Sequence, residues 1–169
     1  MTTISADAIK ELRERTGAGI MDCKRALEDA QGDMDKASDL LKERGIATVA
    51  KKASRAANEG LIETYVHAGG RIGVIVELNC ETDFVARTDD FRELAHNIAL
   101  QVAAMNPQAV DDEIPLDDLD TSEGEPRLLH QPFVKDGSQT ISNLLTDTVA
   151  KVGENIVIKR FARYGIGEE

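Results

Sequence analysis

The sequence predicts an α+β protein, in which an N-terminal module of three short helices and a connecting helix precede a core of a three-stranded antiparallel sheet with packed helices. Two observations lead to this prediction. Apolar residues recur at spacings of three and four through residues 1–45, and in residues 61–67 and 72–78 they alternate at the spacing of two that is typical of strands. The chain has 169 residues, which is enough for one such module and one compact core.

The charge and the apolar content exclude two broad classes of function. The chain has 20 Lys and Arg against 31 Asp and Glu, a net charge of −11. Phosphate backbones are bound chiefly by Lys and Arg, so we expect no direct contact with nucleic acid. The sequence contains neither a signal peptide nor the apolar run of about 18 residues that a transmembrane helix needs, so we expect a cytoplasmic protein without membrane contact. Cys23 and Cys80 lie far apart and are expected to be reduced thiols.

The N-terminal module is expected to span residues 1–45. Ser5 can cap a first helix, which the glycine-containing stretch 16–19 ends. A second helix then begins after Gly19 and ends near Gly32. The amphipathic spacing predicts that the three helices share one small core.

The third helix and its continuation are predicted from their end signals. Asp33 is placed to cap the third helix, and we expect Gly45 to end it. Residues 46–58 are rich in Ala, Lys and Arg and have little apolar bulk. They are therefore expected to form an exposed connecting helix.

Residues 59–169 are expected to form the α+β core. Residues 61–67 and 72–78 alternate in polarity and flank a glycine-containing turn, which predicts a β-hairpin. A hairpin alone is marginally stable in water. Residues 155–164 are rich in β-formers, so we predict that they supply the third strand.

Two amphipathic helices, at 89–105 and between 138 and 152, are predicted to cover the sheet, with an acidic loop at 106–130 between them. Within this loop, residues 111–125 contain eight Asp and Glu and no Lys or Arg. Such a composition buries little apolar surface, so we expect a mobile or loosely packed, solvated loop. A cation site is the alternative, and it would need convergent oxygen ligands.

The common catalytic motifs are absent from the sequence. There is no G-x-x-x-x-G-K-[ST] phosphate loop, and His67, His96 and His130 are dispersed without a serine or cysteine motif beside them. We therefore expect no bond-making chemistry, no cofactor and no bound metal.

Residues 79–89, between the second strand and the long helix, allow two interpretations. In the first, Thr82 or Asp83 caps a helix start, and Phe84 and Val85 are core residues of its first turn. In the second, the adjacent carboxylate and aromatic ring form a rigid probe for a crevice on a partner protein. Residue types alone favour the first interpretation.

Four segments, in this order, resemble a known family. Residues 12–27 (LRERTGAGIMDCKRAL) and 77–86 (ELNCETDFVA) are similar to the two signature regions of bacterial translation elongation factor Ts. Residues 131–136 (QPFVKD) and 153–161 (GENIVIKRF) resemble the closing segments of the same family. Together the segments extend over most of the chain.

This resemblance implies a guanine-nucleotide exchange factor that binds elongation factor Tu in its GDP-bound and nucleotide-free states. The N-terminal module would resemble ubiquitin-associated domains and dock on the nucleotide-binding domain of that GTPase. The resemblance implies that the core then inserts a turn that dislodges Mg²⁺, so that GDP leaves. Carried over to this sequence, the turn consists of Thr82, Asp83, Phe84 and Val85, and the contact face of the module includes Arg13, Ile20 and Met21.

The chain departs from the family in the acidic region, where residues 111–130 leave little room for the helical stretch that other members carry. The core is therefore expected to be a single three-stranded sheet with helices against one face. Short members with one such core are expected to pair, so we predict a homodimer formed through the core sheets.

Two other functions remain as alternatives. A ubiquitin-associated-like binding module or adaptor for a different protein partner would account for the N-terminal third but not for residues 82–85. A hydrolase that uses Asp83 with His67 or His96 is the weaker alternative.

Overall fold

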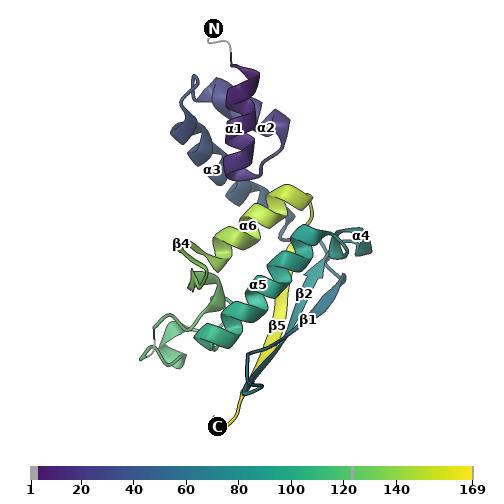
Figure 1. Cartoon of the computed structure of the whole chain (residues 1–169), viewed down its shortest axis with the longest axis vertical. Helices are drawn as coiled ribbons and strands as arrows, with labels where there is room; N and C mark the ends of the chain where they lie inside the picture. The colour runs from purple at the N-terminus through teal and green to yellow at the C-terminus, as the bar shows by residue number, and fades with distance from the viewer. Residues whose placement is uncertain (1–3, 123, 169) are drawn as a thin grey trace. The chain divides into compact units, whose positions relative to one another are not determined.

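A computed structural model describes residues 4–122 and 124–168 and has the predicted α+β architecture (Figure 1). The chain forms two compact units. The first contains the residues up to Ser54 together with Thr146–Gly153, and the second contains Arg55–Leu145 and the residues from Glu154 on. Glu123, one of the acids of the predicted loop, lies outside the described residues.

The N-terminal unit is built on three helices, α1 (Ala6–Thr16), α2 (Ile20–Asp29) and α3 (Met34–Lys52). Each helix contributes small or aliphatic side chains to a common core, as the helical spacing predicts. The buried members of this core are Leu12, Cys23, Ala26, Leu27, Ala30 and Ala37.

Two of these helices begin at the predicted caps. The Ser5 hydroxyl accepts a hydrogen bond from the Ala8 N–H at 3.1 Å. The Asp33 carboxylate accepts the N–H groups of Asp35 and Lys36 at 3.1 and 3.0 Å. The bond from the Lys36 N–H is the main reason that the pKa of Asp33 is lowered. These side chains satisfy N–H groups that have no partner within the helix.

Helix α3 passes through Gly45 without interruption, so the predicted helix end at this residue is wrong. Gly45 is buried, and a Cβ at this position would lie 3.3 Å from Cγ2 of Thr146 in α6 (Ile141–Val152). The glycine thus permits close packing between the two helices. Because Gly45 lies inside the helix, its backbone does not adopt the left-handed conformation in which a glycine often ends a helix.

The core sheet has three antiparallel strands in the order β1–β2–β5. They are β1 (Glu59–Val66), β2 (Ile72–Cys80) and β5 (Ile156–Gly165). The first two form the predicted hairpin, and β5 is the predicted third strand. Central strand β2 therefore pairs with a neighbour along both edges.

Helix α5 (Asp89–Met105) covers one face of this sheet and contacts all three strands (Figure 1). Its apolar stripe is buried, which is the arrangement that the sequence spacing predicts. The buried apolar residues of the stripe are Phe91, Leu94, Ala95, Ile98, Ala99, Val102 and Ala103.

The other face of the sheet exposes apolar side chains. Residues that pair across strands point to the same side, and the pairing register places Ile62, Val66, Ile75 and Tyr164 together on this face. All four are exposed. We call this set the open sheet face.

The acidic region has defined local structure. It contains two short 3₁₀ helices, η1 (Leu116–Asp118) and η2 (Leu128–His130), and Gln108 exchanges two hydrogen bonds with the Asp120 backbone, at 2.7 and 3.0 Å. A two-stranded sheet, β3 (Pro132–Phe133) with β4 (Asp136–Thr140), follows it. This second sheet was not predicted from the sequence.

One backbone position in β1 requires glycine. Gly60 has φ +149°, and a Cβ built there would lie 2.1 Å from the Leu78 carbonyl oxygen and 2.8 Å from Asn79 Cα in the paired strand. We expect Gly60→Ala to lower the free energy of unfolding by about 2 kcal/mol, because the strands must separate or the backbone must change conformation. Urea denaturation measures this loss.

The matched control is Gly73→Ala in the neighbouring strand, where nothing lies within 4 Å of the added Cβ and φ is not positive. This variant is expected to remain within about 0.5 kcal/mol of the wild type. Equal losses in the two variants would contradict the steric interpretation.

Candidate functional site

The 82–85 turn (Thr82, Asp83, Phe84 and Val85) follows directly after strand β2 and opens the short helix α4 (Asp83–Ala86). Thr82 has an extended backbone and is the N-cap, because its hydroxyl accepts the Val85 N–H at 3.5 Å. The predicted helix start is therefore confirmed, with Thr82 as the capping residue.

Phe84 projects from this turn into solvent. Its exposure is 78 %, whereas Val85 is 9 % and Ala86 8 % exposed. The interpretation of both Phe84 and Val85 as core residues is thus correct for Val85 and wrong for Phe84. In one helical turn only one face can be buried, and the buried face here carries Val85 and Ala86. A fully projecting aromatic ring on an anchored turn is typical of a binding surface.

Asp83 lies beside this ring in sequence and is also accessible. Its Oδ2 accepts a hydrogen bond from Nη2 of Arg87 at 2.7 Å, and the two side chains are 48 % and 71 % exposed. An exposed ion pair of this kind contributes little to stability. Its effect is to restrict the direction in which the Asp83 carboxylate points.

The residues before Phe84 are held by Glu154, which sequence reasoning did not single out. Glu154 Oε2 accepts the N–H groups of Glu81 and Thr82 at 3.1 and 3.0 Å, and Oε1 accepts the Thr82 hydroxyl at 2.6 Å. In return, Glu81 Oε1 accepts the Asn155 N–H at 2.7 Å. We call these four residues the carboxylate clamp. The available sequence signal was the position of Glu154 in segment 153–161, which resembles the family.

Cys80 lies at the base of the turn and is buried. Its thiol donates a hydrogen bond to the Thr82 carbonyl at 3.1 Å. Burial raises the pKa of the Cys80 thiol, and the nearby Glu154 carboxylate raises it further. Cys80 is therefore a protonated packing residue and a poor nucleophile.

The residues of the alternative hydrolase site are not brought together. Tyr65 contacts both histidines, through its hydroxyl at 3.1 Å from His67 Nδ1 and by an edge-on ring contact with His96. Tyr65 pairs with Val74, near the turn of the hairpin, whereas Asp83 lies beyond the opposite end of β2. At about 3.3 Å per residue, that separation along the strand is about 20 Å.

The predicted contact residues of the N-terminal module lie around the connection between α1 and α2. Arg13 is an exposed residue in the last turn of α1. Ile20 and Met21 are the first two residues of α2 and are 55 % and 57 % exposed. The start of α2 thus presents two adjacent exposed apolar side chains to solvent.

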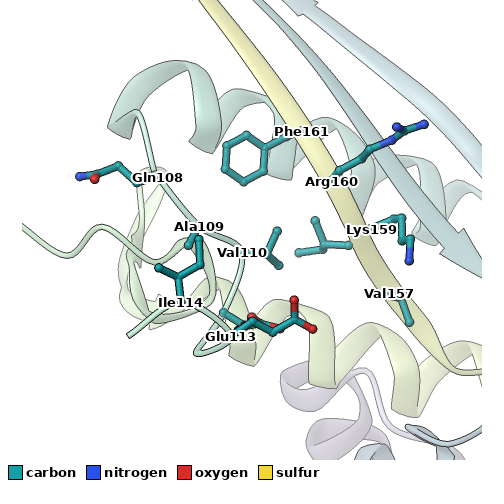
Figure 2. A pocket seen from close by; sticks show the side chains of 11 residues that line it. Gln108, Ala109, Val110, Glu113, Ile114, Val157, Lys159, Arg160 and Phe161 are labelled. Carbon is teal, nitrogen blue, oxygen red and sulfur yellow. Dashed lines mark hydrogen bonds between the residues drawn. The ribbon is translucent and has the colours of Figure 1, made fainter. Parts of the chain in front are cut away.

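A cavity of about 370 Å³ lies between residues 108–114 and strand β5 (Figure 2). Val110 and Ile114 line one side, and Val157 and Phe161 line the other. The Arg160 guanidinium at its edge is bound to Glu77, at 2.7 Å between Nε and Oε2. The lining residues include no histidine, cysteine or serine, so this cavity offers neither a hydroxyl or thiol nucleophile nor an imidazole base.

Residues 4–122 and 124–168 contain neither a cluster of metal-ligating side chains nor a membrane-spanning helix. No group of three or more His, Cys, Asp or Glu side chains in this part of the chain is arranged to hold a metal ion. No helix in the same ranges has both the length and the apolar character needed to cross a membrane.

Comparison with known proteins identifies the family. The family model described as Elongation factor TS matches residues 28–124 and 81–169. The relatives named Elongation factor Ts from Thermoanaerobacter sp. (strain X514) and from Caldanaerobacter subterraneus subsp. tengcongensis are 48 % and 49 % identical to this chain over 195 aligned residues. These alignments cover 98 % of this chain and 96 % and 98 % of the respective relatives.

A third relative named Elongation factor Ts, from Carboxydothermus hydrogenoformans, is 47 % identical, with 98 % of this chain and 90 % of the relative covered. The alignments are longer than the 169 residues of this chain, so the relatives contain residues that have no counterpart here. The similarity nevertheless extends over nearly the whole sequence. This chain therefore belongs to the elongation factor Ts family of translation elongation factors.

Proposed function

We propose that this protein is a guanine-nucleotide exchange factor for elongation factor Tu and works in the cytoplasm. The 82–85 turn inserts beside the nucleotide site of the GTPase, dislodges Mg²⁺ and promotes the release of GDP. The observation that carries this proposal is the 78 % exposure of Phe84 on a turn whose next two residues are buried. The protein makes and breaks no covalent bond in this role and needs no cofactor.

The physical basis is the way in which a GTPase holds GDP. Mg²⁺ and the backbone that cradles the phosphates supply the main electrostatic attraction for the nucleotide. A side chain that displaces either of them weakens GDP binding. Phe84 provides a large, rigid anchor for a crevice, and Asp83 places a carboxylate at the same point.

Exchange also requires that the factor leaves again. Coupling between two ligands of one protein is reciprocal, so a factor that weakens GDP about a thousandfold is itself weakened about a thousandfold by GDP. That coupling corresponds to about 4 kcal/mol. Rebinding of nucleotide therefore releases the factor without any chemical step.

The N-terminal module supplies the second part of the proposed contact. Its exposed residues Arg13, Ile20 and Met21 would dock on the nucleotide-binding domain of the GTPase. Docking through a separate surface supplies affinity, and the turn then acts on the nucleotide site as an intramolecular event.

The proposed assembly is a homodimer formed through the open sheet face. The open sheet face exposes the apolar side chains of Ile62, Val66, Ile75 and Tyr164. A twofold axis through such a face pairs the same residues from two copies and removes them from water.

We expect Asp83→Ala combined with Phe84→Ala to lower the stimulated release of a fluorescent GDP analogue from elongation factor Tu by about 30-fold or more. This is the loss expected when a central interface anchor worth about 2 kcal/mol is removed. A matched control is Leu116→Ala with Asp118→Ala in η1, which removes an exposed apolar residue and a carboxylate elsewhere. The proposed mechanism fails if the two double variants stimulate release equally, or if the wild type stimulates none.

A second variant tests the docking surface. We expect Ile20→Ala with Met21→Ala to raise the factor concentration for half-maximal GDP release by about tenfold or more, while the rate at saturation changes little. The module contributes binding in this scheme, and the turn contributes the effect on GDP. Met105→Ala, also an exposed apolar truncation, serves as the control. A lower saturating rate with an unchanged half-maximal concentration would contradict this division.

The dimer is tested by mass. Light scattering of the wild type at micromolar concentration should give about twice 18.4 kDa, and Ile75→Glu should give about 18.4 kDa. A charge at the centre of the open sheet face would be buried without a partner in the dimer. Val134→Glu, an exposed site outside this face, should leave the dimer intact. A wild-type mass near 18.4 kDa would exclude the dimer.

An adaptor for another partner would recover a different protein in a pull-down experiment. Pull-down from a bacterial lysate should recover a GTPase if the proposal is right. Recovery of a different protein through the N-terminal module, without a contribution from the 82–85 turn, would favour the adaptor.

A further inference from the structure

The carboxylate clamp holds the two residues that follow strand β2. The pairing of β2 with β5 extends only to Cys80 and Ile156. Glu81 and Thr82 lie beyond this last pair, at the point where the chain leaves the sheet for the turn. Their N–H groups donate instead to the Glu154 side chain, at 3.1 and 3.0 Å.

The clamp also determines how the turn is capped. The Thr82 hydroxyl donates to Glu154 Oε1 at 2.6 Å and accepts the Val85 N–H at 3.5 Å. A hydroxyl group has one proton, so donation to Glu154 leaves its lone pairs for Val85. Glu154 therefore orients the group that caps α4, and the cap precedes Phe84 in the same turn.

The reciprocal half of the clamp fixes Glu154 itself. Glu81 Oε1 accepts the Asn155 N–H at 2.7 Å, and Asn155 is 3 % exposed. The Asn155 side chain donates to the Arg55 carbonyl at 2.9 Å. The position of Glu154 is thus set by a buried neighbour. Hydrogen bonds from N–H groups to a carboxylate are stronger than those to neutral acceptors.

We propose that Glu154 is a positioning residue for nucleotide exchange, which holds the 82–85 turn in the conformation that presents Phe84 and Asp83 to the GTPase. This inference rests on the proposed exchange function. Glu154 acts through Thr82, with no contact to the nucleotide. Holding the turn before the partner arrives avoids the entropy loss of ordering it on binding.

The informative variant is Glu154→Gln, which preserves the size of the side chain. A glutamine amide has one acceptor oxygen and an NH₂ group that only donates, so it cannot accept both the N–H groups of Glu81 and Thr82 and the Thr82 hydroxyl proton on two oxygens, as the carboxylate does. Glu125→Gln is the matched control, since Glu125 is also a partly buried carboxylate that accepts a backbone N–H, from Arg127 at 3.0 Å, and it is not part of the clamp.

We expect Glu154→Gln to lower the saturating rate of GDP release from elongation factor Tu about tenfold, with less than a threefold change in the half-maximal factor concentration. The docking surface on the N-terminal module is intact in this variant, so its affinity for elongation factor Tu should be largely retained. The triple variant that combines Glu154→Gln, Asp83→Ala and Phe84→Ala should have the same saturating rate of GDP release as the double variant Asp83→Ala with Phe84→Ala. All three changes act on one turn, so their effects should not add. Glu125→Gln should match the wild type.

Amide hydrogen exchange of the full chain tests the clamp without the GTPase. In Glu154→Gln, the N–H groups of Glu81, Thr82 and Val85 should exchange at least tenfold faster, while those of β2 stay protected. If the wild type fails to release GDP but this pattern is observed, the exchange function is wrong and the clamp stands. Unchanged protection in Glu154→Gln overturns the clamp.

Two kinetic outcomes also overturn the positioning role. One is a saturating rate equal to that of the wild type. The other is a loss that adds fully to that of Asp83→Ala with Phe84→Ala, which would show that Glu154 acts on a different part of the protein.

Discussion

The pairing of strand β2 along both of its edges is the constraint on which the core depends. Its alternate residues Val74, Val76, Leu78 and Cys80 are buried, and α5 packs against the sheet. A slip of one residue would move this whole apolar set to the opposite face of the sheet. The register of β1 and β5 is therefore fixed by burial, and with it the place where β2 ends and the 82–85 turn begins.

The turn combines strong anchoring with an exposed ring. Val85 and Ala86 are buried, Cys80 closes the base, and the carboxylate clamp holds the residues in between. Phe84 is exposed on this framework at little conformational cost, because its neighbours already satisfy the backbone and the core. A ring held in this way loses less entropy on binding than one on a mobile loop.

The large excess of acidic residues has a local structural use. Asp33 caps a helix, Glu154 binds backbone N–H groups next to the turn, and Glu125 accepts both the backbone and the side chain of Arg127. The bond from the Arg127 side chain is the main cause of the lowered pKa of Glu125. Carboxylates are effective in such positions because an ionised acceptor strengthens each hydrogen bond. Part of the negative charge therefore orders loops that contain few apolar side chains.

The sequence by itself determined the type and the order of most helices and strands. The three N-terminal helices, the caps at Ser5 and Asp33, the β1–β2 hairpin, the third strand and the long helix could all be predicted. Each of these depends on spacing or on a cap within a few residues, and such interactions are local in the chain. The resemblance to the family likewise came from contiguous motifs.

Tertiary structure alone decided the features that depend on distant residues. The sequence around Gly45 predicts a helix end. In the structure α3 continues through this residue, and the missing side chain leaves room for Thr146. The sheet register shifts between Glu77 and Leu78, which leaves Lys159 without a partner on β2 and interrupts the alternation of β5. The exposure of Phe84 follows from which face of α4 meets the core. Glu154 reaches Thr82 across 72 residues of sequence, and no local pattern records a hydrogen bond between groups so far apart in the chain.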